Sequence, residues 1–566
     1  MKSLVKIMLF WVSFPAFSAL PELVEVLDIE MNRAIEDLDL DGEGPPWRVR
    51  LDLGEMISVD VSAEMGGLLT EKVITPSMPF RFLNTEVRQG TSLYDSGDFS
   101  DGSTGSYERL PSDLSPAYLQ RKAWMQIDEA YKSAVTGFTR KRSVLPPDEV
   151  DRPAVAPVNL PDSLSASSLP DLDDRWIRET TLALSSVLSE YPLLEAGKSV
   201  GSQAALRRVS LSSEGLRLSR VDTEIVFRVQ GKVRASDGSL LENSRSWIAR
   251  KPNELPAVEV MLSQAHEMAQ ELVERSSARI LDDYIGPVLF EQPASVEFFG
   301  QLLLPEILGT PPAVESPYGA TDEPAQAPRT ARIGRRLLPS GWSIVDDARE
   351  EGPGHYKWDS DGVSPSRVLI VEDGVLRQPL MSRVPVSAES RSTGHGLSGT
   401  GRHLAMPGRI KISPDKVLSS GRLEKKALRA AKVLGRDYVL VVSRLQAMVS
   451  SPNMSRGRGR GETAPGLSAP TEAYLLYKDG RREPVRCASF LGVDRRALRD
   501  VIAAGQVGPT LGRLDQHPSK SRYGRGWTRG VQSGWATPAV LVSELELVSQ
   551  VGGSPRLLPR LEPLSE

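Results

Sequence analysis

Residues 282–291 read Asp-Asp-Tyr-Ile-Gly-Pro-Val-Leu-Phe-Glu, and this stretch divides the chain into two parts with different patterns. Upstream of Asp282, helical periodicity alternates with the period-two pattern of strands. Downstream of it, the pattern is mostly that of strands. The sequence therefore predicts an α+β fold, in which a region of helices and antiparallel strands precedes a mostly-β C-terminal domain.

Upstream of this stretch, apolar residues at helical spacing predict four helices. The second helix has a clear start, because Ser115 suits an N-cap and Pro116 suits the first helical position. The helices are predicted over Leu20–Asp39, from Pro116 past Phe138, over Trp176–Tyr191 and over Pro256–Arg275. Strands are predicted over Val49–Leu53 and Ile57–Ala63, and a strand meander over Val200–Ile248.

Downstream, two Asp-Gly pairs stand between apolar runs, at Asp373-Gly374 and Asp479-Gly480. This dipeptide favours the tight turn of a hairpin, so we expect a β-hairpin at each. Residues 451–470 contain alternating Arg and Gly, which is typical of a loop. Such a segment can bind nucleic acid, but this one is short and single, so we expect no nucleic-acid partner.

Domain boundaries follow from changes in composition, the clearest of which is a stretch at 143–174 that is rich in Pro, Ser and Asp and has no period. The predicted parts are a signal peptide (1–18), an N-terminal domain (19–142), a linker or excursion (143–174), a middle region (175–281), a C-terminal domain (282–550) and a tail (551–566).

Composition narrows the possible classes of function. The chain has 566 residues, 40% of them hydrophobic, and a formal net charge of −4. That length is enough for two or three domains. The charge supplies no global field that would attract nucleic acid or anionic lipid. Its partners must therefore be sought in local features.

The first residues predict export. Lys2 and Lys6 flank a short apolar run, Ile7–Phe14, and the small residues of Ala16-Phe17-Ser18 suit cleavage before Ala19. We expect a secretory signal and a periplasmic or extracellular destination, with a buried N-terminal helix as the alternative. No later run reaches the ~18 apolar residues that a spanning helix needs, so no membrane span is expected.

Cys487 is the only cysteine, so the chain cannot form an intramolecular disulfide. A thiolate zinc site that needs several cysteines is excluded by the same count, and only five histidines are available. We interpret Cys487 as a small buried residue, with a reactive thiol as the alternative.

The C-terminal half resembles the TldD/PmbA family of zinc peptidases. The resemblance begins at residues 282–291 and continues through blocks that follow in family order. These blocks are Gly334-Arg335-Arg336, Val345-Asp346-Asp347, Asp361-Gly362-Val363, Glu372-Asp373-Gly374-Val375-Leu376, Met381-Ser382-Arg383, Thr471-Glu472-Ala473-Tyr474 and Pro538-Ala539-Val540-Leu541. Upstream, Val87-Arg88-Gln89-Gly90, Tyr94-Asp95 and Ala130-Tyr131-Lys132 are similar to a TldD-related subgroup. Regions 19–142 and 282–550 are therefore interpreted as TldD/PmbA-like domains.

The resemblance implies a zinc site that this chain lacks. Catalytic family members carry His-Glu-x-x-x-His on a helix and a late cysteine, which hold zinc and its activated water. Phe290 and Ser295 stand at the two histidine positions, and Gly526–Gly530 has no thiol where the cysteine is expected. Glu291 keeps the glutamate position, but without zinc it has no activated water to serve. No cofactor or metal is expected.

Other histidines give weak alternatives. His266-Glu267 resembles the start of a zinc-peptidase motif, but Gln270 stands where the second histidine is needed, so a solvent-facing pair on an amphipathic helix is the simpler interpretation. A glycine-rich loop, Thr393–His403, also matches G-x-G-x-x-G, but Pro407 follows where a helix is required. We expect either a mobile surface loop or a groove that uses His395, His403 and Arg409 as contacts.

Two functions remain open. In the first, the chain is a non-metal, PmbA-like subunit that binds extended peptide and forms a dimer, possibly with a zinc-bearing homologue. In the second, it is a stand-alone extracytoplasmic protein that adds a peptide to a sheet edge. An active metallopeptidase with a rearranged site is the third and least supported reading, because fold resemblance alone does not grant activity.

Overall fold

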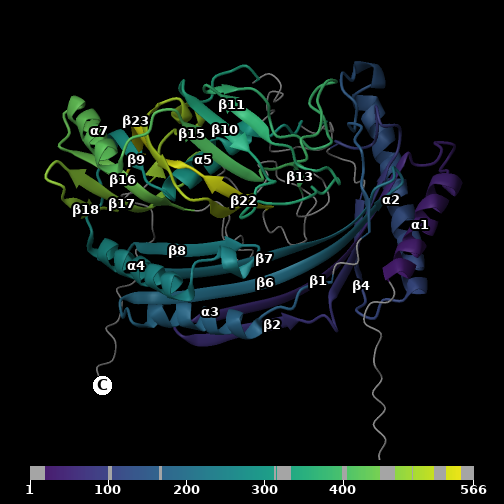
Figure 1. Cartoon of the computed structure of the whole chain (residues 1–566), viewed down its shortest axis with the longest axis horizontal. Coiled ribbons are helices and arrows are strands. Elements are labelled where there is room, and N and C mark those ends of the chain that lie inside the picture. The colour runs from purple at the N-terminus through teal and green to yellow at the C-terminus, as the bar shows by residue number, and fades with distance from the viewer. Residues whose placement is uncertain are drawn as a thin grey trace, which may run out of the picture.

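The computed structural model describes residues 20–99, 105–164, 168–311, 314, 333–397, 404–446, 466–486, 489–515 and 531–549. The signal peptide, residues 451–465 of the Arg/Gly segment, His403, Cys487, Gly526–Gly530 and the tail lie outside these residues. A long curved sheet with helices forms the N-terminal half, and a strand-rich C-terminal half lies against one side of it (Figure 1). Helices and antiparallel strands in the first half and mostly strands in the second confirm the predicted α+β class.

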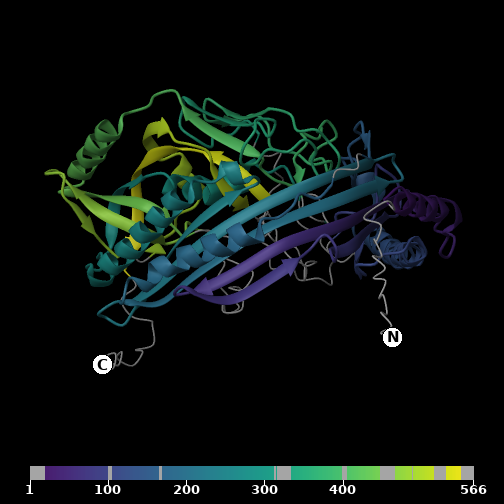
Figure 2. The same ribbon diagram turned by 60° about the horizontal axis from the view of Figure 1, so that its bottom comes forward.

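The N-terminal half is built on an eight-stranded sheet with the order β4-β3-β1-β6-β7-β5, in which β2 also pairs with β1 and β8 with β7. Three of the strands are very long and run the length of this half (Figure 2). The strands are β1 (Arg48–Glu64), β2 (Gly67–Ile74), β3 (Phe80–Arg88), β4 (Gly105–Leu110), β5 (Asp162–Ser163), β6 (Leu194–Ser212), β7 (Arg217–Arg234) and β8 (Leu240–Ala249).

The sheet joins strands from both sides of the 143–174 stretch. β1 pairs antiparallel with β6 from Arg50 opposite Ser212 to Glu64 opposite Lys198. Regions 19–142 and 175–281 therefore share one sheet. The two strands predicted at Val49–Leu53 and Ile57–Ala63 are one continuous strand, because Gly54 stays in register and the ring of Phe82 lies over it.

Four helices cover one face of this sheet. They are α1 (Leu20–Asp37), α2 (Pro116–Val144), α3 (Asp174–Ser189) and α4 (Val258–Ser277), and all four were predicted. The Ser115 Oγ caps α2 by accepting from the Tyr118 N–H at 3.3 Å. Odd-numbered residues of β1 face the helices: Leu51 packs with α1 and α2, and Val59 packs with α3 and α4.

The C-terminal half contains one seven-stranded and one six-stranded sheet and a two-stranded ribbon. The first has the order β18-β17-β16-β9-β23-β19 with β20 on β23, and the second has the order β12-β11-β10-β15-β22-β21. Its first strands are β9 (Tyr284–Phe290), β10 (Trp342–Asp346), β11 (Val368–Glu372), β12 (Val375–Leu376), β13 (Gly396–Leu397), β14 (Leu404–Ala405) and β15 (Arg409–Pro414). The others are β16 (Tyr438–Leu445), β17 (Pro470–Tyr477), β18 (Arg482–Pro484), β19 (Ser489–Phe490), β20 (Val501–Val507), β21 (Leu511–Asp515), β22 (Val531–Ala536) and β23 (Pro538–Val548).

Both predicted hairpins are confirmed: β11 and β12 pair around Asp373-Gly374, and β17 and β18 pair around Asp479-Gly480. The largest apolar core lies between the two C-terminal sheets and contains helices α5 (Ala294–Leu302) and α6 (Leu304–Ile307). Helix α7 (Ser420–Val433) covers the other face of the seven-stranded sheet. No described helix is both long and apolar enough to cross a membrane.

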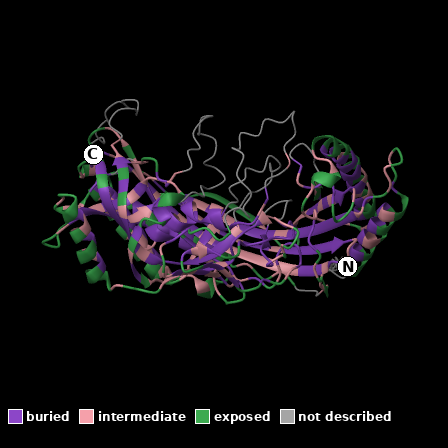
Figure 3. Cartoon of the chain, turned by 90° about the horizontal axis from the view of Figure 1, so that it is seen from above, coloured by how far each residue is buried: buried purple, intermediate pink, exposed green. Residues whose placement is uncertain are grey.

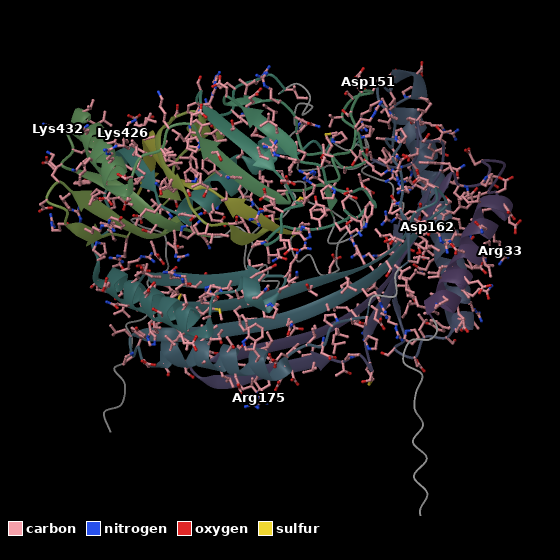
Figure 4. All side chains as sticks on the ribbon, viewed as in Figure 1. Arg33, Asp151, Asp162, Arg175, Lys426 and Lys432 are labelled. Atoms are coloured by element: carbon pink, nitrogen blue, oxygen red, sulfur yellow. The ribbon has the colours of Figure 1, made fainter. Side chains whose placement is uncertain are left out.

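Buried residues run along the strands of both halves, and exposed residues follow the outer sides of the helices (Figure 3). The labelled charged side chains of helices α1, α3 and α7 lie at the periphery (Figure 4). Charged residues also occur in the interior, on the face of the long sheet turned toward the C-terminal half.

Candidate functional site

Phe290, which the resemblance assigns to the first histidine position, is the last residue of β9 and is completely buried. Its ring centroid lies 4.8 Å from that of Phe298 and 6.0 Å from that of Phe490. The side chain is thus part of an aromatic cluster in the main C-terminal core, where packing is as dense as in any protein interior.

Ser295, at the second histidine position, lies in the first turn of α5 and is also completely buried. Its hydroxyl is 2.8 Å from the Thr537 hydroxyl, so both polar groups are satisfied. Pro293 immediately precedes α5. A proline is tolerated at this position, whereas it would break the interior of a helix. The two motif positions therefore lie on a strand end and a helix start, not on the single helix that the resemblance implies.

Glu291 points to the opposite face of the sheet from Phe290, since successive strand residues alternate. Its N–H donates to the Val442 carbonyl at 3.0 Å, which keeps it in strand register. Its carboxylate accepts from the Ser443 hydroxyl and the Tyr474 hydroxyl, both at 2.7 Å. Burial first, and then the Glu291 charge, raise the pKa of Tyr474, so this phenol stays a hydrogen-bond donor.

Zinc does not fit these three positions. Phe290 offers only carbon, Ser295 offers a neutral hydroxyl that is already bonded, and Glu291 lies on the other face of the sheet. Within the described residues, no three His, Cys, Asp or Glu side chains group as a metal site would require.

His395 is fully buried, so the structure places it inside the C-terminal half and not on a groove wall. Its Nε2 lies 3.1 Å from Asp346 Oδ1, and its Nδ1 lies 2.9 Å from the Thr393 hydroxyl. Tyr356 packs edge-on against its ring. Every ring nitrogen is thus engaged within the fold.

Arg409 lies beside the same carboxylate, since its backbone N–H donates to Asp346 Oδ1 at 3.1 Å. Its guanidinium donates to the Glu351 carbonyl at 2.8 Å and pairs with Glu350 at 3.3 Å. The structure brings His395 and Arg409 together through Asp346. Neither side chain reaches the neighbourhood of Glu291 in any described contact.

His266 lies on α4, where its Nδ1 is 3.2 Å from the Tyr191 hydroxyl of the α3–β6 connection. The rings of these two residues are 6.0 Å apart. This contact gives His266 a packing role between the two helices.

A small cavity lies where the sheet meets the 143–174 stretch and the C-terminal half. It is lined by Arg48, Glu86, Arg88, Val155, Asp361, Arg383 and Val384. Glu214 accepts both Arg383 amino groups, at 3.1 and 2.8 Å, and lies 2.8 Å from Arg48 Nε. Opposite charges therefore alternate around the cavity, which gives it no preference for an anion or a cation.

Residues 286–548 match the model of the PmbA/TldA metallopeptidase C-terminal domain. The chain belongs to the TldD/PmbA family. This match covers β9, α5 and the buried aromatic cluster around Phe290.

Solved structures match the TldD/PmbA chain over nearly its whole length. A candidate modulator of a DNA gyrase from Thermotoga maritima is 13% identical with a TM-score of 0.58, covering 93% of this chain and 100% of that one. TldE from Thermococcus kodakarensis is 14% identical with a TM-score of 0.57, with the same coverage. At this identity the likeness shows the shared fold. No curated protein matches the sequence.

Sequence reasoning missed the charged face of the long sheet. Arg50 and Asp52 alternate with the apolar residues of β1, so they point away from the helices. Arg50 is 1% exposed at the side chain, pairs with both oxygens of Asp52 at 2.9 and 3.1 Å, and donates to the Ser360 carbonyl at 2.6 Å. The alternation Arg48-Val49-Arg50-Leu51-Asp52-Leu53 carried this information, because a polar residue at every second position can face a second buried layer.

Proposed function

We propose that this TldD/PmbA-family chain takes part in proteolysis without holding zinc, as a subunit that binds extended peptide and completes the cleft of a zinc-bearing homologue. Family membership supports a role related to proteolysis. The observation that carries the finer proposal is Phe290, whose ring fills the first ligand position with core packing. The signal-like first residues extend the proposal to an exported protein.

Glu291 supports the same proposal. In a zinc peptidase the glutamate must reach the metal-bound water, whereas here Tyr474 and Ser443 occupy both carboxylate oxygens. The side chain serves as a hydrogen-bond acceptor between strands. Its retention is thereby explained by packing, without a catalytic step.

A second candidate is a stand-alone peptide-binding protein, which the outer edge of β2 favours. Leu68, Leu69 and Val73 are exposed along this strand, and in the described part of the chain β2 pairs only with β1. An unpaired edge can accept an extended peptide as a further strand.

The experiment purifies the full chain without chelator and measures bound metal by elemental analysis, together with cleavage of an unstructured peptide pool. We expect less than stoichiometric zinc and no cleavage by the chain alone. Adding a family member that carries His-Glu-x-x-x-His should produce a stable complex and cleavage. Glu291→Gln is the matched variant, and it should change neither metal content nor the cleavage by the complex.

One tightly held zinc per chain with chelator-sensitive cleavage would contradict the proposal. A metal-free monomer that binds peptide but never associates with the zinc-bearing member would favour the stand-alone function.

A further inference from the structure

Arg208 is a buried arginine without a partner. It lies on β6 and is 8% exposed, with Gly54 opposite it on β1 and Arg220 opposite it on β7. Its Nε is buried and has no hydrogen-bond acceptor. Within the described residues, no hydrogen bond or ion pair uses its two terminal amino groups, which are not enclosed as Nε is. The guanidinium end is therefore the reachable part of the side chain.

This situation is unusual, because a buried charge is ordinarily paired and hydrogen-bonded. Burial first, and then the charge of Arg220, lower the pKa of Arg208. The neighbouring strand offers a direct contrast, since Arg50 faces the same side and has a full set of acceptors. The fold thus tolerates an arginine whose charge it does not itself neutralise.

The carboxylates near Arg208 already have other partners. Among the neighbouring charges, Arg220 and Arg50 lower the pKa of Arg208, and Asp52 and Asp222 raise it. Asp222 lies 3.2 Å from Arg220 Nε, and Asp52 is engaged by Arg50 and Ser210. Because other donors hold both carboxylates, Arg208 keeps donors for a further anion.

Arg220, opposite Arg208 on β7, is held by other contacts. Arg220 Nη1 donates to the carbonyls of Trp358 and Asp359, at 3.3 and 2.8 Å, so the C-terminal half holds it in place. The ring of Phe82 covers Gly54 beside Arg208, because a Cβ at Gly54 would overlap that ring. This apolar neighbour lowers the local dielectric and strengthens any ion pair that Arg208 makes.

We propose that Arg208 is an anion-binding residue on the sheet face turned toward the C-terminal half, and that it receives a peptide carboxylate there. That the ligand is a peptide rests on the proposed function. That it is an anion rests on Arg208. A guanidinium fork pairs with a carboxylate through two parallel hydrogen bonds. Inorganic phosphate offers similar oxygens, so the experiment includes it as a separate arm.

The test measures binding to the full chain of a short fluorescent Gly/Ala peptide with a free C-terminal carboxylate, the same peptide with a C-terminal amide, and inorganic phosphate. We expect the free carboxylate to bind about tenfold more tightly than the amide, as a charge-assisted pair would give. Arg208→Met should bind both peptides equally, at the amide's affinity.

Arg207→Met is the matched control, because Arg207 is the next residue on β6, faces the helices and pairs with Glu55. It should lower the melting temperature and keep the tenfold preference. Arg208→Met should keep or raise the melting temperature without ligand, since it removes an unpaired buried charge. This difference shows that lost binding is not lost folding.

Equal binding of both peptides by the wild-type chain would overturn this inference and leave the proposed function standing. Phosphate binding that depends on Arg208, without any peptide binding, would overturn the peptide source and the proposed function together. A fall in the melting temperature of Arg208→Met as large as that of Arg207→Met would assign Arg208 to the structure and sink the proposal.

Discussion

The two faces of the eight-stranded sheet bury side chains of opposite character. On the helix-covered face, residues such as Leu51 and Val59 lie in apolar clusters with α1 to α4. On the face turned toward the C-terminal half, Arg50 and Arg220 donate to backbone carbonyls of residues 358–360. The first face is held by the hydrophobic effect, which has no direction. The second is held by hydrogen bonds, which do.

This difference explains how the C-terminal half is held in one position against the sheet. Apolar surfaces tolerate small shifts, whereas a guanidinium that reaches particular carbonyl groups defines one position of the C-terminal half. We interpret the charged face as the layer that orients the C-terminal half. The same face contains Arg208, the one arginine among these whose charge the described contacts leave unanswered.

The largest loss of stability is expected from a substitution on the charged face of the sheet. Arg50→Met should destabilise the chain by about 4 kcal/mol, because it removes the ion pair of the buried Asp52, which keeps only Ser210 as a donor, and the donor of the Ser360 carbonyl. Chemical denaturation followed by tryptophan fluorescence measures the loss. A variant as stable as the wild type would show that Arg50 adds nothing to the contact between the halves.

The next largest loss of stability is expected on the apolar, helix-covered face of the sheet. Leu51→Ala should cost about 3 kcal/mol, since it leaves a cavity in the cluster that joins α1 and α2 to the sheet. Leu69→Ala on the exposed β2 strand is the control and should change stability by less than about 0.5 kcal/mol. Equal losses of stability at both positions would mean that burial does not explain the effect of Leu51→Ala.

The last prediction concerns the pH dependence of stability and sharpens the comparison on the charged side. Burial first, and then the Asp361 carboxylate, raise the pKa of Asp359 to about 7. A folded-state pKa above the unfolded value of about 4 means that the folded state binds the proton more tightly. Stability from this group is therefore complete below about pH 4 and is lost as the pH rises to about 7.

Asp359→Asn should remove that component, so its unfolding free energy should fall less between pH 4 and pH 7 than that of the wild type. Three backbone N–H groups donate to Asp359, from Asp361, Val363 and Gly396, so the variant also loses some stability at every pH. The slope is the informative quantity, and denaturation across this pH range measures it. Parallel curves for the two proteins would rule out Asp359 as the titrating group.

Sequence patterns predicted the local structure well where a short-range signal exists. The four N-terminal helices, the Ser115 cap and both Asp-Gly hairpins form as expected, because helical periodicity and turn chemistry act over a few residues. The assignment of Phe290 and Ser295 to the two histidine positions stays a prediction from the resemblance. Export, the dimer and the peptide remain predictions.

Other features could not be inferred in this way. β1 and β6 pair across more than a hundred intervening residues. This pairing depends on long-range contacts, which no local sequence pattern encodes. The burial of His395 against Asp346 is similar, because a glycine-rich loop is equally compatible with a surface groove. The charged sheet face was visible as an alternation in β1, but only a second layer of protein turns such an alternation into a buried network.

By itself, the sequence determined which N-terminal helices and which hairpins form, and which face of each helix is apolar, because these properties depend on residue type and spacing. The tertiary structure alone decided that Phe290 ends a strand while Ser295 starts a helix, and that Glu291 and Phe290 lie on opposite faces of the sheet. It also decided that Arg50 has partners while Arg208 has none among the described residues. The physical reason is that burial and hydrogen bonding depend on what the distant parts of the chain bring to a side chain.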